Sequence, residues 1–277
     1  MSIELLYTGV LQGLILAIIA FGIMIPFRFL NFPDLTAEGA YPLGGAVCAS
    51  LMVADMPQIL AMMAGIMAGG LLAVGTSQVA LRLKVSSLLS GIILSTMAYS
   101  INLRVMGKPN IALFDMDDIH FDFISLIIVI ILCIIPFALF LHTDFGLRFR
   151  TVGINSKFAI NHNISVNKYT SLGLFIAGSM FGLAGSLMVQ MQQFMDIGMG
   201  VGIVIHGLAS LMIGESIVGN STIPKQLVAP IIGSLIYQQI QGVALSLGLA
   251  PSDLKLFTGS MVLIVLAIQK GGKDVSQ

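Results

Sequence analysis

The sequence contains no tryptophan, only two cysteines, and few charges: 9% of its residues are Asp, Glu, Lys or Arg. Such scarcity excludes an ordinary soluble domain, in which about a quarter of the residues are charged. Cys48 and Cys133 lie inside apolar stretches, which indicates packing rather than a disulfide framework. The chain also lacks the phosphate-binding pattern G-x-x-x-x-G-K-[ST], so it does not bind ATP phosphates in that mode.

Apolar residues, by contrast, are abundant. Of 277 residues 57% are hydrophobic, and the mean hydropathy is +0.99. A chain of this length cannot hide so many apolar side chains in a core, so part of its solvent must be lipid. We therefore expect one all-α domain over residues 1–277, a polytopic transmembrane helical bundle with about 8–10 membrane segments.

The apolar runs predict the individual spans, because a transmembrane helix needs about 20 apolar residues. The predicted spans are 5–25, 58–80, 85–103, 123–141, 170–192, 201–218, 227–248 and 254–269. The stretch 37–53 is short and follows Pro33 and Asp34, which indicates an interrupted or half-depth helix. The N-terminus is outside if this stretch crosses the membrane, and inside if it re-enters.

The basic residues predict the orientation, since Lys and Arg gather in cytoplasmic connections. With the polar loop 142–169 in the cytoplasm, ten basic residues lie inside: Arg28, Arg82, Lys84, Arg148, Arg150, Lys157, Lys168, Lys225, Lys270 and Lys273. The opposite side then holds only Arg104, Lys108 and Lys255, together with the acidic group Asp115, Asp117, Asp118 and Asp122.

Thirty glycines are present, and several are spaced four residues apart, including Gly65 with Gly69 and Gly178 with Gly182. Small residues at this spacing let helix backbones approach closely in a membrane. The pairs indicate either simple close packing or surfaces that slide in a moving transporter.

Residues 142–169 form the longest polar stretch of the chain and the one richest in basic side chains. We expect Ser156 to cap a short helix that begins at Lys157, and Gly153 to supply a left-handed turn before it. The charges alone fit two interpretations equally: a loop that only obeys the positive-inside rule, or a docking platform.

This loop resembles that of the permease subunits of ATP-binding-cassette importers of the branched-chain amino acid and ribose type. The residues at the family's motif positions are Gly146, Arg150, Gly153, Asn155, Ala159 and the turn Asn163-Ile164-Ser165-Val166. Thr151 and Asn163 replace the usual alanine and glycine. The resemblance continues through 171–187 and 200–220, where Gly214, Ser216 and Gly219 match and Glu215 replaces a glycine. The run 34–39 is most similar to a subgroup linked to amino acids such as tryptophan.

The resemblance implies a non-catalytic transport subunit in the inner membrane of a bacterium, and a set of partners. These are a second permease copy, cytoplasmic ATPase subunits that bind ATP and Mg, and an extracytoplasmic substrate-binding protein; no cofactor is expected in this chain and no nucleic acid among its partners. The 142–169 loop would couple to the ATPase through Gly146, Arg148, Arg150, Gly153, Asn155, Ala159 and Asn163.

A few polar residues in apolar surroundings are candidates for the translocation path: Asp34, Thr36, Glu38, Ser95 and Asn102. Ionisable groups at membrane depth are costly and usually face a cavity or a partner. The segment 31–45 is either a structural turn or part of the path. His206, in an apolar stretch, fits a hydrogen-bonded packing role better than a proton relay.

Two other classes of protein remain as alternatives. A secondary transporter driven by an ion gradient should show disrupted helices at corresponding places in two halves, and only the segment near 31–45 is disrupted. A membrane enzyme would need a convergent catalytic set. The four histidines have no metal-binding spacing, and His120 lies in the acidic group, which we expect to form an external loop that meets a binding protein.

Overall fold

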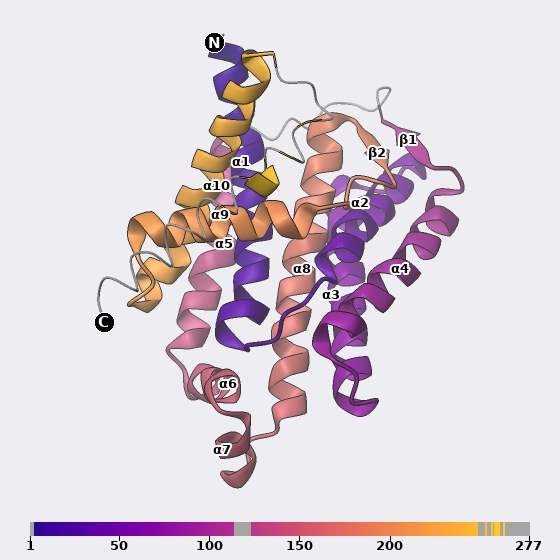
Figure 1. Cartoon of the computed structure of the whole chain (residues 1–277). Coiled ribbons are helices and arrows are strands. Elements are labelled where there is room, and N and C mark those ends of the chain that lie inside the picture. Colours follow the sequence, from indigo (N-terminus) through magenta and orange to yellow (C-terminus); the bar gives the residue numbers. More distant parts are fainter. Residues whose placement is uncertain are drawn as a thin grey trace.

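The computed structural model describes residues 3–113 and 123–248, together with residues 253, 256, 258–260 and 263. Helices dominate these residues, with two three-residue strands (Figure 1). The elements in chain order are α1 (Ile3–Met24), the π-helical turn η1 (Ile25–Phe29), α2 (Ala37–Val53), α3 (Gln58–Arg82), α4 (Ser87–Met106), β1 (Asn110–Ala112), α5 (Phe123–Leu141), α6 (Asp144–Ile154), α7 (Ser156–Asn161), α8 (Val166–Gln192), β2 (Phe194–Asp196), α9 (Ile203–Val218) and α10 (Ile223–Ser246).

Six helical segments of the described chain have the length and apolar composition to cross a membrane. They are Leu6–Phe29, Gln58–Arg82, Ser87–Met106, Phe123–Leu141, Val166–Gln192 and Ile223–Ser246. Each corresponds to a span expected from the sequence, within a few residues at either end. The prediction of a polytopic helical bundle is therefore confirmed.

Two further helices are shorter: α2 has 17 residues and α9 has 16. At a rise of about 1.5 Å per residue, neither matches a hydrocarbon core about 30 Å thick. The span expected over 201–218 is thus a short helix, and α9 lies across the bundle rather than along it (Figure 1). The span expected over 254–269 and the acidic group 115–122 lie largely outside the described residues.

The chain runs up and down between two ends of the bundle. β1 and β2 pair antiparallel, Asn110 opposite Asp196, and join the end of α4 to the end of α8. The starts of α4 and α8 consequently lie at the other end, with α6 and α7. The start of α1 lies at the end opposite α6 and α7 (Figure 1).

Glycines let α3 and α8 pack backbone against backbone, in the most extensive contact between two helices of the described residues. Gly65 and Gly69 on α3 face Gly178 and Gly182 on α8 so closely that a Cβ on Gly69 would fall on the carbonyl oxygen of Gly178. Gly44 brings α2 to the same place, since its own Cβ would fall on the backbone of Gly182. The spacing noted in the sequence therefore marks close packing of three helices.

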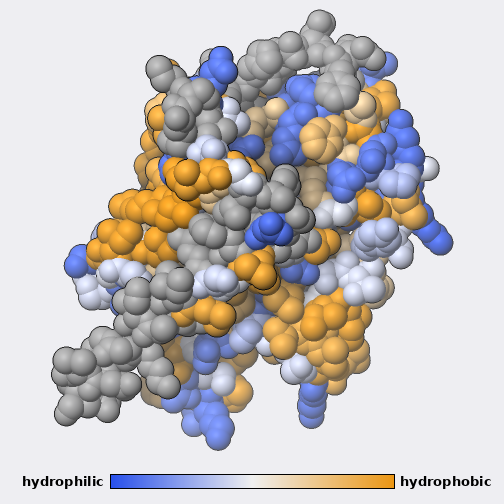
Figure 2. Space-filling view, turned by 45° about the horizontal axis from the view of Figure 1, so that its top comes forward, coloured by the Kyte–Doolittle hydropathy of each residue, from blue (hydrophilic) through white to orange (hydrophobic). Residues whose placement is uncertain are grey.

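The outer surface of the bundle is apolar along its length. Ile59 on α3 and Ile124 and Leu132 on α5 are at least 70% exposed. In the view of Figure 2, hydrophobic side chains cover much of the flank and hydrophilic ones gather toward its ends. An apolar surface of this extent fits contact with lipid or with a partner subunit, and does not fit water.

The glycine contact predicts an asymmetry between two Gly→Ala substitutions. Gly69→Ala should lower the free energy of unfolding by about 1–3 kcal/mol, because the added methyl group meets backbone that cannot yield. Gly242→Ala in α10 is the control, since no described atom lies within 4 Å of its Cβ position. It should raise stability by about 0.4–1 kcal/mol. Denaturant titration in mixed micelles measures both, and an equal effect of the two substitutions contradicts the packing described.

Candidate functional site

The polar segment between α5 and α8 folds into two short helices, α6 and α7. We call residues 143–165 the α6–α7 platform. The Thr143 hydroxyl accepts a hydrogen bond from the Gly146 N–H (3.2 Å), and the Asn155 Oδ1 accepts one from the Phe158 N–H (3.0 Å). Side-chain oxygens at these positions satisfy the free N–H groups of a first helical turn. Both helices thus begin at a polar cap.

Two details expected for this segment are wrong. Asn155 caps α7, whereas Ser156 is already its first residue. Gly153 lies within α6, and the left-handed residue is Asn163, with φ 57°. Asn155 was a better cap because its amide oxygen reaches the N–H three residues on, and asparagine also tolerates the left-handed conformation at 163.

All seven residues expected to couple the chain to an ATPase lie on the platform: Gly146, Arg148, Arg150, Gly153, Asn155, Ala159 and Asn163. The two glycines serve close packing, since a Cβ on Gly146 would meet the backbone of Phe140 and one on Gly153 the backbone of Phe29. Ala159 is buried, whereas Arg148 is exposed. The Nε atom of Arg150 is buried and has no hydrogen-bond partner among the described residues.

The platform also exposes large apolar side chains. Ile154 is 85% exposed, and Phe145, Leu147, Phe158 and Ile160 are each at least half exposed. The same two helices carry Arg148, Arg150 and Lys157. Charged helices of this kind do not span the hydrocarbon core of a bilayer. A cluster of exposed apolar groups on a polar element is typical of a site that contacts a protein or a membrane surface.

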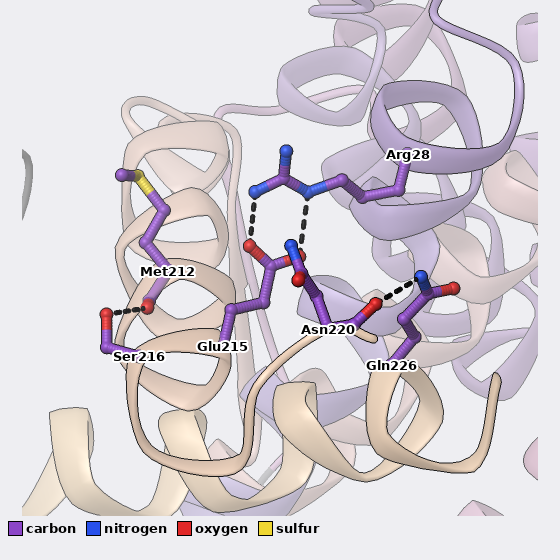
Figure 3. A network of polar contacts seen from close by, with 6 residues as sticks. All are labelled: Arg28, Met212, Glu215, Ser216, Asn220 and Gln226. Atoms are coloured by element: carbon purple, nitrogen blue, oxygen red, sulfur yellow. Dashed lines mark hydrogen bonds and ion pairs between the residues drawn. The ribbon is translucent and has the colours of Figure 1, made fainter. Parts of the chain in front are cut away.

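The platform rests on η1, the turn that ends α1. Gly153 lies against the backbone of Phe29, and the rings of Phe29 and Phe149 are 6.5 Å apart. The next residue back, Arg28, forms an ion pair with Glu215 near the end of α9: its Nε donates to Oε1 (2.7 Å) and its Nη2 to Oε2 (Figure 3). Consequently, a continuous set of contacts joins the platform to α9 through η1.

The irregular segment between η1 and α2 contains a buried hydrogen-bonded cluster. Asp34 Oδ1 accepts hydrogen bonds from the backbone N–H and the hydroxyl of Thr36. The Thr36 hydroxyl lies 2.7 Å from the hydroxyl of Thr76 on α3. Asp34 and Thr36 are buried, and the second oxygen of Asp34 has no partner among the described residues. These two expected path residues thus lie together and fix the start of α2 to α3.

The other three expected path residues line a single cavity. This α2–α4 cavity has a volume of about 270 Å³ and lies between α2, α4 and the segment 197–201. Glu38, Ser95 and Asn102 border it, and so do Thr96 and Tyr99. The Glu38 Oε1 accepts a hydrogen bond from the Gly202 N–H (3.2 Å), which ties the segment after β2 to the start of α2.

A second cavity of about 240 Å³ lies on the other side of α2, among α1, α8, α9 and α10. Its described lining contains no Asp, Glu, Lys or Arg, and its polar residues are rich in amides: Gln12, Tyr41, Gln192, His206, Gln238 and Gln241. The Tyr237 hydroxyl lies 3.0 Å from His206 Nδ1 and donates a hydrogen bond to the Thr258 hydroxyl (2.9 Å). His206 therefore has the hydrogen-bonded environment expected for it.

Several residues of these sites were not foreseen. Thr76, Thr96 and Tyr99 gave no signal because a lone polar residue in an apolar helix does not reveal which face it occupies. One member of the Arg28–Glu215 pair could have been noticed in the sequence. Glu215 stands where the family motif within residues 200–220 has a glycine. Among the described residues, no group of three His, Cys, Asp or Glu side chains could hold a metal ion.

These features define a class of protein: a polytopic membrane protein with polar cavities inside the bundle and a pair of short polar helices at one end. Residues 5–267 match the model of the branched-chain amino acid transport system permease component family. The chain belongs to this family.

Two relatives support the assignment. A tyrosine transport system permease protein of Clostridioides difficile (strain R20291) is 37% identical over 260 residues, which cover 92% of this chain and 88% of the relative. An uncharacterized protein of Rickettsia prowazekii (strain Madrid E) is 31% identical over 277 residues, covering 96% and 98% of the two chains. No solved structure matches this chain significantly.

The Arg28–Glu215 pair predicts unequal effects of removing its two members. The Glu215 side chain is 5% exposed and that of Arg28 is 42% exposed. Arg28→Met leaves a buried carboxylate without its partner and should cost about 1.5–3 kcal/mol of unfolding free energy. Glu215→Gln should cost less, because water can solvate the exposed guanidinium. The same titration measures both, and a larger loss for Glu215→Gln would show that the pair does not hold in solution.

Proposed function

We propose that this chain is the membrane-spanning subunit of an ATP-binding-cassette importer that carries an amino acid into a bacterial cell. The family describes permease components, and one relative is named for tyrosine transport. The chain forms the path for the solute, and ATP and Mg are bound by partner chains. Its own part is a change of helix packing, driven by the partners, rather than covalent chemistry.

The proposal includes three partners. A second copy of the chain completes the pore in the inner membrane, ATPase subunits dock on the α6–α7 platform from the cytoplasm, and an extracytoplasmic binding protein delivers the solute. The exposed apolar side chains of the platform are the observation that carries it, because an apolar patch such as that of Ile154 and its neighbours suits contact with a docked subunit. The positive-inside bias supports a cytoplasmic position for the same helices.

The main alternative is a secondary transporter driven by an ion gradient. Such a chain would need no apolar docking surface on a polar platform, and its family would not be one of permease components of a larger system. The two functions differ in their energy source, and uptake measurements distinguish them.

Uptake should depend on ATP and survive the loss of the ion gradient. In membrane vesicles with the complete transporter, ATP depletion should reduce uptake of radiolabelled L-tyrosine to background, whereas an ionophore should leave most of it. ATP in the lumen and an inactive ATPase variant serve as controls. Uptake that persists without ATP and collapses with the ionophore would establish the alternative.

Ile154→Asp should separate the permease from its ATPase. The side chain is 85% exposed, so the fold should be unaffected, but a charge in an apolar interface core should reduce copurification of the ATPase about tenfold or more. ATP-driven uptake should fall in parallel. Leu247→Asp is the matched control, since Leu247 is 80% exposed and follows α10 at the end opposite the platform. If the ATPase copurifies with the Ile154→Asp variant as it does with the native chain, the platform is not the docking surface.

A further inference from the structure

We infer that the α2–α4 cavity binds the zwitterionic part of an α-amino acid on its way through the membrane. Glu38 receives the ammonium group and Asn102 receives the carboxylate. This inference rests on the proposed function, and it adds a site, a ligand class and separate roles for two residues.

Asn102 is the first observation. Its side chain is 0% exposed, it lines the cavity, and neither its amide nitrogen nor its amide oxygen has a hydrogen-bond partner among the described residues. A buried amide without partners is destabilising, and most such groups in proteins are satisfied. An exception that borders a cavity indicates a ligand that supplies the missing partners. The amide nitrogen offers N–H donors suited to a carboxylate.

Glu38 is the second observation. It is the only charged side chain among the described residues that line the cavity. One of its oxygens accepts the Gly202 N–H, and the described residues provide no hydrogen bond to the other. Carboxylates within a membrane protein usually face a cavity and mark a solute path. A carboxylate with no cation beside it favours an ammonium group as its partner.

Two hydroxyl groups strengthen the preference for an ammonium group. Ser95 and Thr96 both donate to the Ile92 carbonyl oxygen, at 3.0 and 2.8 Å. Each hydroxyl hydrogen is therefore engaged, and the oxygens that border the cavity are left to act as acceptors. Acceptors together with a carboxylate match the three N–H donors of an ammonium group.

The remaining lining selects the side chain of the amino acid. Pro42, Ile197, Val201 and the ring of Tyr99 make the rest of the wall apolar or aromatic. A volume of about 270 Å³ is near the lower limit of about 300 Å³ for small-molecule sites. The cavity thus suits one neutral amino acid of moderate size, and a second carboxylate on the ligand would meet Glu38 without a cation to pair with.

The test measures binding of radiolabelled L-tyrosine to the permease–ATPase complex in nanodiscs without ATP, with competition by two analogues. Tyramine lacks the carboxylate, and 3-(4-hydroxyphenyl)propionate lacks the ammonium group. Glu38→Gln should weaken the binding of L-tyrosine about tenfold or more, because a hydrogen bond to a charged group is lost. The same variant should change the affinity for 3-(4-hydroxyphenyl)propionate less than about twofold. Asn102→Leu should weaken the binding of L-tyrosine several-fold and leave the binding of tyramine nearly unchanged.

A purely structural role for either residue predicts a different result. A variant that only disturbs the fold would weaken the binding of all three ligands alike. The inference instead requires that each variant weaken the binding of some of these ligands and not of others. Asn102→Leu should in addition raise or preserve the midpoint of thermal unfolding of the ligand-free complex, because it removes an unsatisfied buried amide. Glu4→Gln, a substitution of an exposed carboxylate on α1, is the control for Glu38→Gln and should change nothing.

The outcomes separate the site from the function. If the native complex imports L-tyrosine with ATP but both variants bind all three ligands as it does, the site is wrong and the function stands. Uniform weakening of the three ligands also overturns the site. If the native complex imports no amino acid with ATP, the proposed function and the site fall together.

Discussion

The close approach of α3 and α8 is the contact on which the other parts of the structure depend. In a membrane, apolar surfaces gain little by leaving lipid, so helices associate through van der Waals packing, which weakens quickly with distance. Glycines at 65, 69, 178 and 182 let the two backbones touch, and Gly44 brings α2 to the same contact. Nearer the platform, the Ser77 and Ser171 hydroxyls lie 2.8 Å apart. The start of α2 is then fixed by Thr36 and Thr76.

The platform contacts α8 within the group of α2, α3 and α8, and it also reaches α9, which lies outside the group, through η1. Gly153 lies on the backbone of Phe29, and the adjacent Arg28 holds Glu215 on α9. These contacts join α6 to α9 through η1 without passing the glycine contact. The ion pair is half exposed on the arginine side, so its net contribution is modest and it can break and reform.

The sequence predicted the long helices well and the local details less well. Hydropathy located all six long spans, because about 20 apolar residues in succession have few other interpretations. It did not show that α9 is short and lies across the bundle, since an apolar run does not reveal its direction. The platform was predicted from charge and motif, but its caps were misassigned, because Asn155 and Ser156 are adjacent and both are common caps. The grouping of Glu38, Ser95 and Asn102 in one cavity depends on how α2 and α4 pack, which no single sequence states.

Polar residues in this bundle fall into two kinds, and the difference bears on what each does. Ser77, Thr36 and Thr76 are buried and bonded to neighbours on other elements, so they stabilise the packing that buries them. Asn102 is as deeply buried, but its amide atoms have no hydrogen-bond partner among the described residues. Leucine at this position would fit an apolar helix and avoid the cost of desolvating an amide. A fold that keeps asparagine there gives up stability, and such losses concentrate at sites where a protein binds something else. At the α2–α4 cavity, therefore, the residue at position 102 is not the one that stable packing alone would favour.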